Sequence, residues 1–401
     1  MADWMALEKK YFMRTVERAP LTLVKGEGSY VWDEFGKKYL DFVAGWAVNS
    51  LGHCHPAVVD AVRHQVGELI QTSNHYYTIP QLQLAELLVE NSSLDKIFLC
   101  NSGAEAAEGA VKLARRYGKL HLNGAYEVIT GTGSFHGRTL AMVSASGQLK
   151  HQAPYTPLPA GFINVEYNNI EAIKKATTDT VCAVMLEPVQ GEGGVNVPAP
   201  GYLKDVRRWC DEKGIVLILD EIQTGIGRTG TLFAHQSFDI EPDIMSLAKG
   251  LGGGLPIGAI TAKDKFSVFT FGEHGSTFGG NPVTCAAAFA TMKFILENDI
   301  PRNAFDMGQY LIEHLKRLAA KSPGTITEIR GKGLLLAVQF SEDIAKKLAQ
   351  ECLENGLLVN DVKPDALRLM PALTITRSEI DEAVKILEKS LSRLHAGQHD
   401  K

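Results

Sequence analysis

The sequence predicts an α/β protein with a mostly parallel sheet and a smaller α+β part near its C-terminal end. From about residue 56, short apolar runs alternate with stretches of helical periodicity, which is the pattern of strands and crossover helices in a parallel sheet. Several of these runs end in polar or glycine-rich residues, as strands do where their carboxyl ends face a ligand. The C-terminal quarter mixes helices and strands less regularly.

The composition narrows the class of protein further. A chain of 401 residues with 45% hydrophobic and 22% charged residues is long enough for one large and one small globular domain. Its net charge of −5 argues against a nucleic acid or an anionic membrane as the main partner. We find no stretch long and apolar enough to span a membrane and no signal peptide, and the six scattered cysteines form no CxxC pair. We therefore expect a cytoplasmic protein with reduced thiols.

The elements follow in order along the chain. Residues 18–45 alternate apolar and polar residues around the turn EFGKK, which predicts short strands. A helix is expected to begin at Pro56, a favourable first-turn residue, and a second one covers 80–91. Strands are then expected over 96–100, 126–130, 181–187, 215–220, 243–248 and 256–261, and helices over 104–118, 201–214 and 282–298. The last part is expected to hold strands within 324–340 and 367–375 and helices over 342–356 and 378–394.

Two of the predicted strands are followed by segments that suit a phosphate or a flat ring. Asn101, Ser102 and Gly103 precede a strongly helical run, and a helix start with small residues presents free N–H groups to an anion. An ordinary N-cap at Ser102, with a glutamate three residues later, explains the same residues. The segment GTGSFHGRT, at 131–139, resembles a dinucleotide fingerprint but has His136 in place of the third glycine. It offers Phe135 to stack on a ring and Arg138 to bind a carboxylate, or it is a glycine-rich turn with Phe135 in the core.

Three further strand ends carry charged residues. Glu187 and Glu192 follow the strand at 181–187 and are either part of a site or solvated loop residues. Asp220 ends the fully apolar run IVLIL, and Lys249 stands between another apolar run and the loop GLGGGLPIG. A lysine placed there has a depressed pKa and reacts as a nucleophile through a Schiff base, unless its side chain extends to the solvent.

These strand ends meet at one edge of one sheet, and together they match the needs of one cofactor. Pyridoxal 5′-phosphate (PLP) carries a phosphate, a flat pyridine ring, a ring nitrogen that must stay protonated and an aldehyde that a lysine captures. A carboxylate beside the ring nitrogen favours its protonated form, because a nearby opposite charge raises its pKa. This explains why a buried strand would end in Asp220.

The same motifs resemble those of the class III aminotransferases, a family of PLP enzymes. The similarity extends from GSYVWDEFGKKYLDFVAGWAVNSLGHCHP to LRLMPALTIT and includes NSGAEAAEGAVKLAR, FHGRT, EPVQGEGGV, LILDEIQTGIGRTG, PDIMSLAKGLGGGLPIGA and HGSTFGGNP. The resemblance implies PLP-dependent transferase fold type I, with a large domain around a mostly parallel seven-stranded sheet and a smaller α+β domain. It implies a division into an N-terminal segment that packs with the small domain, a large PLP-binding domain and a C-terminal small domain, at residues 1–55, 56–290 and 291–401.

The resemblance also implies roles for individual residues. Lys249 would bind PLP covalently and move the proton of the substrate's Cα, Asp220 would hold the ring nitrogen and Gln223 the ring hydroxyl. Phe135 would stack on the ring, and Thr277 would reach the phosphate of the neighbouring subunit, so the active form would be a homodimer. The full set expected to bind the cofactor is Ser102, Gly103, Ala104, Phe135, Asp220, Glu221, Ile222, Gln223, Lys249 and Thr277.

For the substrates, the resemblance implies an amino donor that reacts at its far end and 2-oxoglutarate as the acceptor. Arg138 would bind the donor's α-carboxylate and Arg368 that of glutamate or 2-oxoglutarate, while Glu192 would cover Arg368 when the donor is bound. The remaining residues expected near the substrate are Ser276, Trp46 and Tyr77. Trp46 replaces a smaller aliphatic residue, which leaves the identity of the donor open.

Within the family, the length and motifs are most similar to members that transfer the terminal amine of N2-acetylornithine, a step of arginine biosynthesis. Ornithine, succinylornithine, 4-aminobutyrate and N-acyl-lysine remain open as donors. From another enzyme class, the aminomutase of glutamate 1-semialdehyde is the alternative, although a mutase does not need the carboxylate clamp of Arg138. A non-enzymatic role would require a damaged catalytic set, and Lys249, Asp220 and Arg138 are all present. No metal is expected, since the sequence His53-Cys54-His55 matches the family's turn before a helix.

Overall fold

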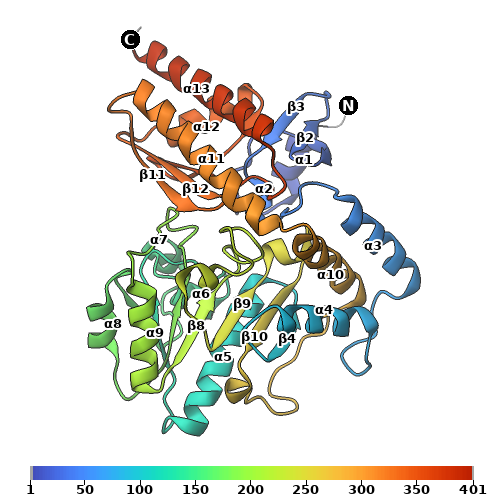
Figure 1. Cartoon of the computed structure of the whole chain (residues 1–401), viewed down its shortest axis with the longest axis vertical. Coiled ribbons are helices and arrows are strands. Elements are labelled where there is room, and N and C mark those ends of the chain that lie inside the picture. Colours follow the sequence, from blue (N-terminus) through green and yellow to red (C-terminus); the bar gives the residue numbers. More distant parts are fainter. Residues whose placement is uncertain (1–2, 400–401) are drawn as a thin grey trace.

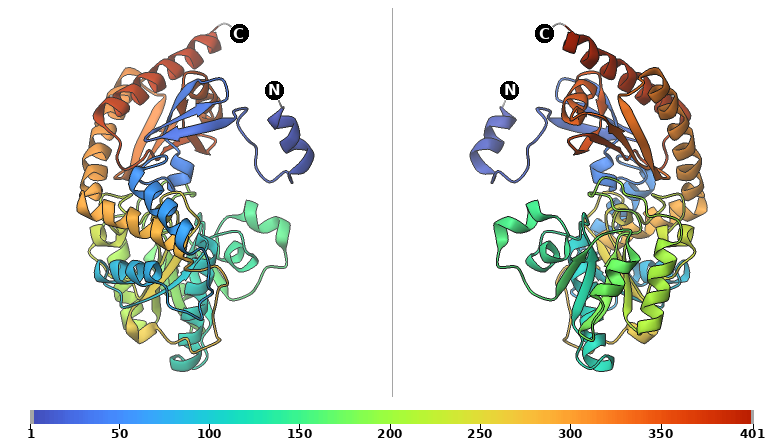
Figure 2. Two further views of the ribbon diagram at one scale, coloured as in Figure 1. Left: turned by 90° about the vertical axis from the view of Figure 1, so that its right-hand side faces the viewer. Right: turned by 90° about the vertical axis from the view of Figure 1, so that its left-hand side faces the viewer.

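The computed structural model describes residues 3–399, with side chains up to residue 394. One large part is built around the main sheet, and a smaller part carries both ends of the chain (Figure 1). The first helix, α1 (Trp4–Tyr11), buries none of its residues and stands away from the rest of the molecule (Figure 2). The α/β class and the mostly parallel sheet predicted from the sequence are confirmed.

The main sheet has seven strands in the order β4-β10-β9-β8-β7-β5-β6. Strand β10 pairs antiparallel with both of its neighbours, and the other pairs are parallel. Every residue of β7, β8, β9 and β10 is buried, which explains why these strands are continuous apolar runs without alternation. The strands are β4 (Lys96–Cys100), β5 (Glu127–Gly131), β6 (Phe162–Val165), β7 (Val181–Leu186), β8 (Val216–Asp220), β9 (Ile244–Leu247) and β10 (Gly258–Ala262).

Helices cover the main sheet and connect it to the smaller part. Helix α5 packs against the sheet on a face rich in alanine and glycine, because small residues let the helix approach the strands closely. At Gly109, for example, a Cβ would lie 2.2 Å from the Cδ1 atom of Ile260 on β10. The helices of this part are α3 (Pro56–Glu68), α4 (Ile79–Glu90), α5 (Gly103–His121), α6 (Leu140–Ala145), α7 (Leu149–Gln152), α8 (Ile170–Ala176), α9 (Tyr202–Lys213) and α10 (Pro282–Glu297). Short 3-10 helices are η1 (Ala153–Tyr155), η2 (Ala234–Phe238), η3 (Lys249–Gly252) and η4 (Asp264–Phe266).

The smaller part holds two four-stranded sheets. One has the order β11-β12-β15-β14 and the other the order β1-β2-β3-β13. In the second sheet, the short strand β13 pairs in parallel with β3, so the first strands of the chain are joined to its C-terminal part. The strands are β1 (Leu23–Glu27), β2 (Tyr30–Asp33), β3 (Lys38–Asp41), β11 (Ile326–Lys332), β12 (Leu335–Phe340), β13 (Leu357–Leu358), β14 (Asn360–Lys363) and β15 (Ala366–Leu369).

The helices of the smaller part include one that the sequence reading did not predict. Helix α11 (Ile300–Lys321) begins only two residues after α10 ends. The other helices are α2 (Ala44–Ala47), α12 (Ala345–Glu354) and α13 (Arg377–His399). None of the helices that the structure describes is long and apolar enough to cross a membrane.

Candidate active site

A cavity of about 460 Å³ lies at the carboxyl ends of the central strands, where the sequence predicted a site. It brings together residues from all five of the strand-end segments. Ten of the predicted site residues line it: Ser102, Gly103, Ala104, Phe135, Arg138, Glu192, Asp220, Ile222, Gln223 and Lys249.

Lys249 is the lysine in the lining of this cavity. It follows β9 and begins the 3-10 helix η3 with a φ of +41°, an uncommon value for a residue other than glycine. Burial lowers the pKa of its ammonium group below the usual value, and the positive charge of Arg368 acts in the same direction, while Glu192 opposes both. A lysine with a lowered pKa keeps more of its amine uncharged and therefore nucleophilic at neutral pH.

Asp220 forms a buried ion pair with His136. The His136 Nδ1 atom lies 2.7 Å from the Asp220 Oδ2 atom, and the side chain of Asp220 is 3% exposed. Burial works to lower the pKa of His136, but the hydrogen bond and charge of Asp220 outweigh burial and raise it. The other oxygen of Asp220 accepts a hydrogen bond from the backbone N–H of Ile222. The carboxylate is thus fixed in direction at the tip of β8.

Glu187 is buried, so the solvated-loop explanation is wrong for this residue. Burial raises the pKa of its carboxyl group to about 7, and the charge of His136 only partly compensates. Its two oxygens accept hydrogen bonds from the backbone N–H groups of Phe135 and Gly191. Glu187 therefore ties the segment that carries Phe135 to the loop that carries Glu192.

Ser102 serves as the N-cap of α5 and also lines the cavity. Its hydroxyl accepts a hydrogen bond from the backbone N–H of Glu105, and the Glu105 side chain accepts one from the backbone N–H of Asn101. Only the Ser102 half of the expected capping box is formed, because Glu105 bonds to the N–H of Asn101 and not to that of the N-cap Ser102. The cap and an anion-binding helix start are compatible here, because Gly103 and Ala104 also face the cavity.

Glu192 and Arg368 form an ion pair at the border of the cavity. The Arg368 Nη1 atom lies 2.7 Å from the Glu192 Oε1 atom, with the arginine side chain 1% exposed and the glutamate 33%. Burial by itself would raise the pKa of Glu192, but the charges of Arg368 and Lys249 hold it below the usual value. Asn360 and Gln223 accept the other hydrogen bonds of Arg368.

Glu221 lies outside the cavity, in contrast to its neighbour Asp220. Successive side chains of a strand point in opposite directions, and the fully buried carboxylate of Glu221 turns towards η2. It accepts hydrogen bonds from the backbone N–H groups of Ala234 and His235 and pairs with the His235 imidazole at 2.9 Å. In this structure Glu221 stabilises the loop behind the site.

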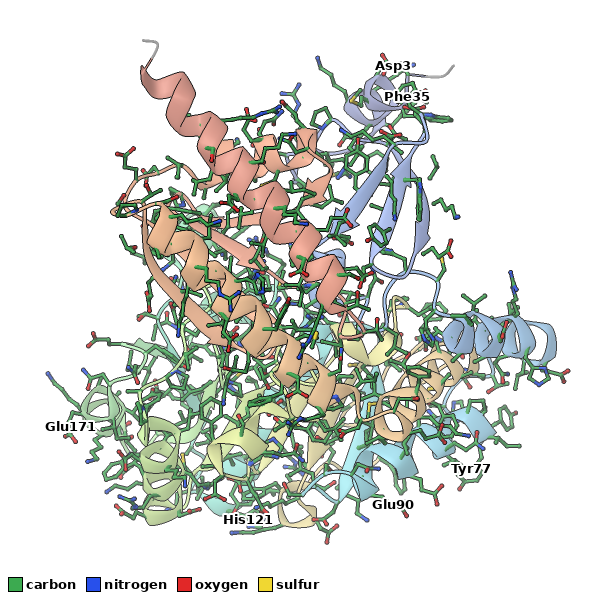
Figure 3. The ribbon with its side chains drawn as sticks, turned by 45° about the horizontal axis from the view of Figure 1, so that its top comes forward. Asp3, Phe35, Tyr77, Glu90, His121 and Glu171 are labelled. Carbon is green, nitrogen blue, oxygen red and sulfur yellow. The ribbon has the colours of Figure 1, made fainter. Side chains whose placement is uncertain are left out.

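Four more predicted residues are not part of the cavity lining. Ser276 touches its border, because its hydroxyl accepts a hydrogen bond from the side chain of Asn101. Thr277 is exposed on the surface beside it. Trp46 is 50% exposed in the left-handed turn of α2, and Tyr77 is 93% exposed at the edge of the molecule (Figure 3).

The two histidines of the triplet His53-Cys54-His55 have partners within the protein. His53 bonds to Asp41 at 2.8 Å, and His55 packs against the ring of Phe294. Cys54 is exposed. Among the side chains that the structure describes, no group of three or more potential ligands could hold a metal ion.

Comparison with known proteins identifies the class to which the fold and the site belong. The family model described as "Aminotransferase class-III" matches residues 11–391, and the chain is a member of this family. The acetylornithine aminotransferase of Caldanaerobacter subterraneus subsp. tengcongensis is 50% identical over 388 residues, which cover 96% of this chain and 98% of the relative.

Two solved structures are similar over almost the whole chain. An ornithine aminotransferase from Toxoplasma gondii, whose description mentions partial occupancy of PLP at the active site, has a TM-score of 0.94 at 35% identity and covers 99% of this chain and 96% of its own. The acetylornithine aminotransferase of Elizabethkingia anophelis has a TM-score of 0.87 at 35% identity and covers 97% of this chain and 98% of its own. The protein is thus a PLP-dependent transaminase of fold type I.

The residues of the cavity fit this cofactor. Gln223 lines the cavity, and its buried Nε2 has no hydrogen-bond partner among the described residues, so a donor is free to meet a ring hydroxyl. A Cβ at Gly191 would lie 1.8 Å from the Gln223 Oε1 atom, so a larger residue there would displace the Gln223 amide. The cavity thus presents a free donor, an aromatic ring at Phe135, a desolvated carboxylate and a lysine in its lining.

Proposed function

We propose that the protein transfers the terminal amine of N2-acetylornithine to 2-oxoglutarate, giving N-acetylglutamate 5-semialdehyde and glutamate, as a step of arginine biosynthesis in the cytoplasm. The Glu192–Arg368 pair beside Lys249 is the observation that carries this proposal, because it supplies a carboxylate-binding arginine that can be covered. The similarity to relatives named acetylornithine aminotransferase favours acetylornithine as the donor.

PLP, when bound, would accept the electron pair left when a C–H bond breaks at the substrate carbon that bears the reacting amine. Lys249 would be the residue for covalent attachment. Once the substrate amine has displaced it, its uncharged amine would take the proton from that carbon and give it to the cofactor, and the reverse half-reaction would return a proton to the acceptor. Asp220, oriented by His136, holds the ring nitrogen in its protonated form. Phe135 packs on the ring, and the start of α5 at Ser102 binds the phosphate.

The pair of Glu192 and Arg368 lets one pocket accept two kinds of substrate. With the pair closed, a donor without a carboxylate beside its reacting amine fits next to Lys249. With Glu192 displaced, Arg368 binds the carboxylate beside the reacting carbon of glutamate or 2-oxoglutarate. Asn360 keeps two hydrogen bonds to Arg368 in either case, so the guanidinium stays in place when the pair opens.

The rest of the substrate site is proposed from the surface around the cavity. Arg138 is exposed at its mouth, 5.3 Å from the ring of Phe135, where it is accessible to a donor carboxylate. Ser276, Trp46 and Tyr77 complete this site in the proposed homodimer, in which Thr277 reaches the phosphate site of the partner subunit. The proposed domains are 1–55 with the small domain, 56–290 as the PLP-binding domain and 291–401 as the small domain.

The donor is tested by titrating the PLP-loaded protein with single amines in the absence of an acceptor. The absorption band of the bound cofactor is followed with acetylornithine, ornithine, succinylornithine, 4-aminobutyrate and an N-acyl-lysine. Conversion at a far lower concentration of acetylornithine than of the others supports the proposal. If another amine converts the cofactor at the lowest concentration, the transaminase class stands and acetylornithine is the wrong donor. Isomerisation of glutamate 1-semialdehyde without an acceptor would favour the aminomutase.

A further inference from the structure

We propose that Arg330 is a specificity-positioning residue that holds the Glu192 loop on the small sheet, so that Glu192 is presented to Arg368. This inference rests on the proposed function, since it concerns the alternation between the two substrates. The Glu192 loop is defined as residues 187–196, which follow β7 and include the isolated bridge of Gln190 with Asn196.

The first observation is a row of paired residues across the sheet β11-β12-β15-β14. Arg330 on β11 pairs with Ala337 on β12, and Ala337 pairs with Arg368 on β15. On β14, Asn360 pairs with the same arginine. Directly paired residues of adjacent strands project from the same face of a sheet. The two arginines therefore lie on one face, two strands apart, with a small side chain between them.

The second observation is that both arginines hold the same loop. Arg330 donates from Nε and Nη2 to the carbonyl oxygen of Gly194, at 2.9 and 2.7 Å. Arg368 holds the other side of the loop through Glu192. Val189 and Val195 of the loop belong to the same buried apolar cluster as Ala337, the residue paired with both arginines.

The third observation is that further contacts hold Arg330 on the carbonyl oxygen of Gly194, whereas the bond of Arg368 to Glu192 is the one that a substrate replaces. The Arg330 guanidinium is also fixed by the side chains of Gln339 and Glu328, at 3.0 and 2.9 Å, and is 13% exposed. Gly194 has a φ of +115°, and a Cβ there would lie 2.9 Å from the Nζ atom of Lys363. The next residue, Val195, is buried with a φ of +56°, a strained conformation for a β-branched residue.

A strained turn keeps its shape only where its surroundings hold it. Arg330 supplies that hold to a backbone carbonyl, which no substrate competes for, whereas the bond to Glu192 is exchanged for a substrate carboxylate. When Glu192 leaves Arg368, the loop remains docked and the glutamate side chain returns to the same place. Without Arg330, the loop is less well ordered, the pair is closed for a smaller fraction of the time, and Arg368 is more available.

Glutarate tests this inference, because it carries two carboxylates but neither an amine nor a keto group. Its dissociation constant for the PLP-loaded protein is measured by calorimetry in the wild type and in Arg330→Gln. We expect the variant to bind glutarate about threefold tighter or more, since apparent affinity scales with the fraction of competent sites. The kcat/KM of the glutamate half-reaction should rise relative to that of the donor, by a lower KM and not by a higher kcat.

The matched control is Glu328→Gln, which removes the charge of an exposed partner of Arg330 but leaves the contact to Gly194. It should bind glutarate like the wild type. Unchanged glutarate affinity in a folded Arg330→Gln variant overturns the inference. If that variant does not fold, Arg330→Lys replaces it: a lysine keeps one contact to the carbonyl, and a shift in the same direction supports the inference while no shift overturns it.

A further variant separates this inference from the proposed function. The ion pair of Glu192 and Arg368 is called the gate below. Glu192→Gln removes the negative charge of this gate and should tighten glutarate binding more than Arg330→Gln does. If Glu192→Gln has no effect on glutarate, the gate of the proposed function fails. If Glu192→Gln tightens binding and Arg330→Gln does not, the gate stands and the positioning role of Arg330 is wrong.

Discussion

Loss of charge at two neighbouring carboxylates at the tip of β8 should change two different properties of the protein. Asp220 lines the cavity and is paired with His136, while Glu221 is buried behind it and accepts two backbone N–H groups and the His235 imidazole. The substitutions Asp220→Asn and Glu221→Gln keep the shape of each side chain. The first should weaken the binding of PLP, and the second should weaken the fold.

The contacts of the two carboxylates set the expected size of each change in free energy. In Glu221→Gln, an amide N–H₂ replaces one of the two acceptor oxygens, so at least one buried donor loses its partner, which costs about 1–3 kcal/mol. In Asp220→Asn, a hydrogen bond to a charged group becomes neutral; such bonds contribute about 1.5–3 kcal/mol, so the affinity for PLP should fall about tenfold or more.

The assay uses the cofactor-free protein for both variants. Urea unfolding reports the free energy of unfolding, and the quenching of tryptophan fluorescence by added PLP reports its dissociation constant. The reasoning is refuted if Glu221→Gln weakens PLP binding as much as Asp220→Asn does while its free energy of unfolding stays at the wild-type value. That result would mean that Glu221 faces the cofactor.

Three further predictions concern the other groups of the site. Lys249→Ala should abolish turnover with every donor, and appreciable residual transamination would contradict its role as the attachment point and proton carrier. Glu192→Ala should shift the preference from ω-amine donors to α-amine donors, measured as the ratio of kcat/KM values; an unchanged ratio would reject the gate. Burial raises the pKa of Glu187 to about 7 from an ordinary value of 4.5, so its contribution to stability is complete below pH 4.5 and is lost as the pH rises through 7. The free energy of unfolding of the wild type relative to Glu187→Gln should therefore fall between pH 4.5 and 7 and level off above; a difference that does not change with pH would show that Glu187 is not perturbed by burial.

Local pattern was enough to predict the strand ends and the residues that line the cavity. Asp220 and Lys249 could be found because each ends an apolar run, and parallel strands bring such ends to one edge. Glu187 has the same position after a strand, but its burial could not be predicted, because it depends on the segment around Phe135, which packs against it from elsewhere in the chain.

The features that the sequence did not reveal depend on contacts between distant residues. The sequence showed His136 only as the residue in place of a fingerprint glycine, since its partner Asp220 is 84 positions away. Arg330 showed no signal, because it bonds to a backbone carbonyl 136 positions away. Helix α11 was missed for a local reason: only two residues separate it from α10, so no recognisable loop marks the boundary.

The parallel pairing of β3 with β13 has a consequence for how the chain is made. The backbone N–H groups of Leu40 and Phe42 bond to the carbonyl oxygens of Gly356 and Leu358. During synthesis the strands β1, β2 and β3 therefore emerge early from the ribosome, and the outer edge of β3 stays unpaired until residue 358 has been made. Unpaired strand edges pair with other chains. A nascent chain that stalls before residue 358 therefore exposes an aggregation-prone strand edge near its N-terminus. In the finished protein, β13 covers this edge of β3 and so protects it from pairing with other chains.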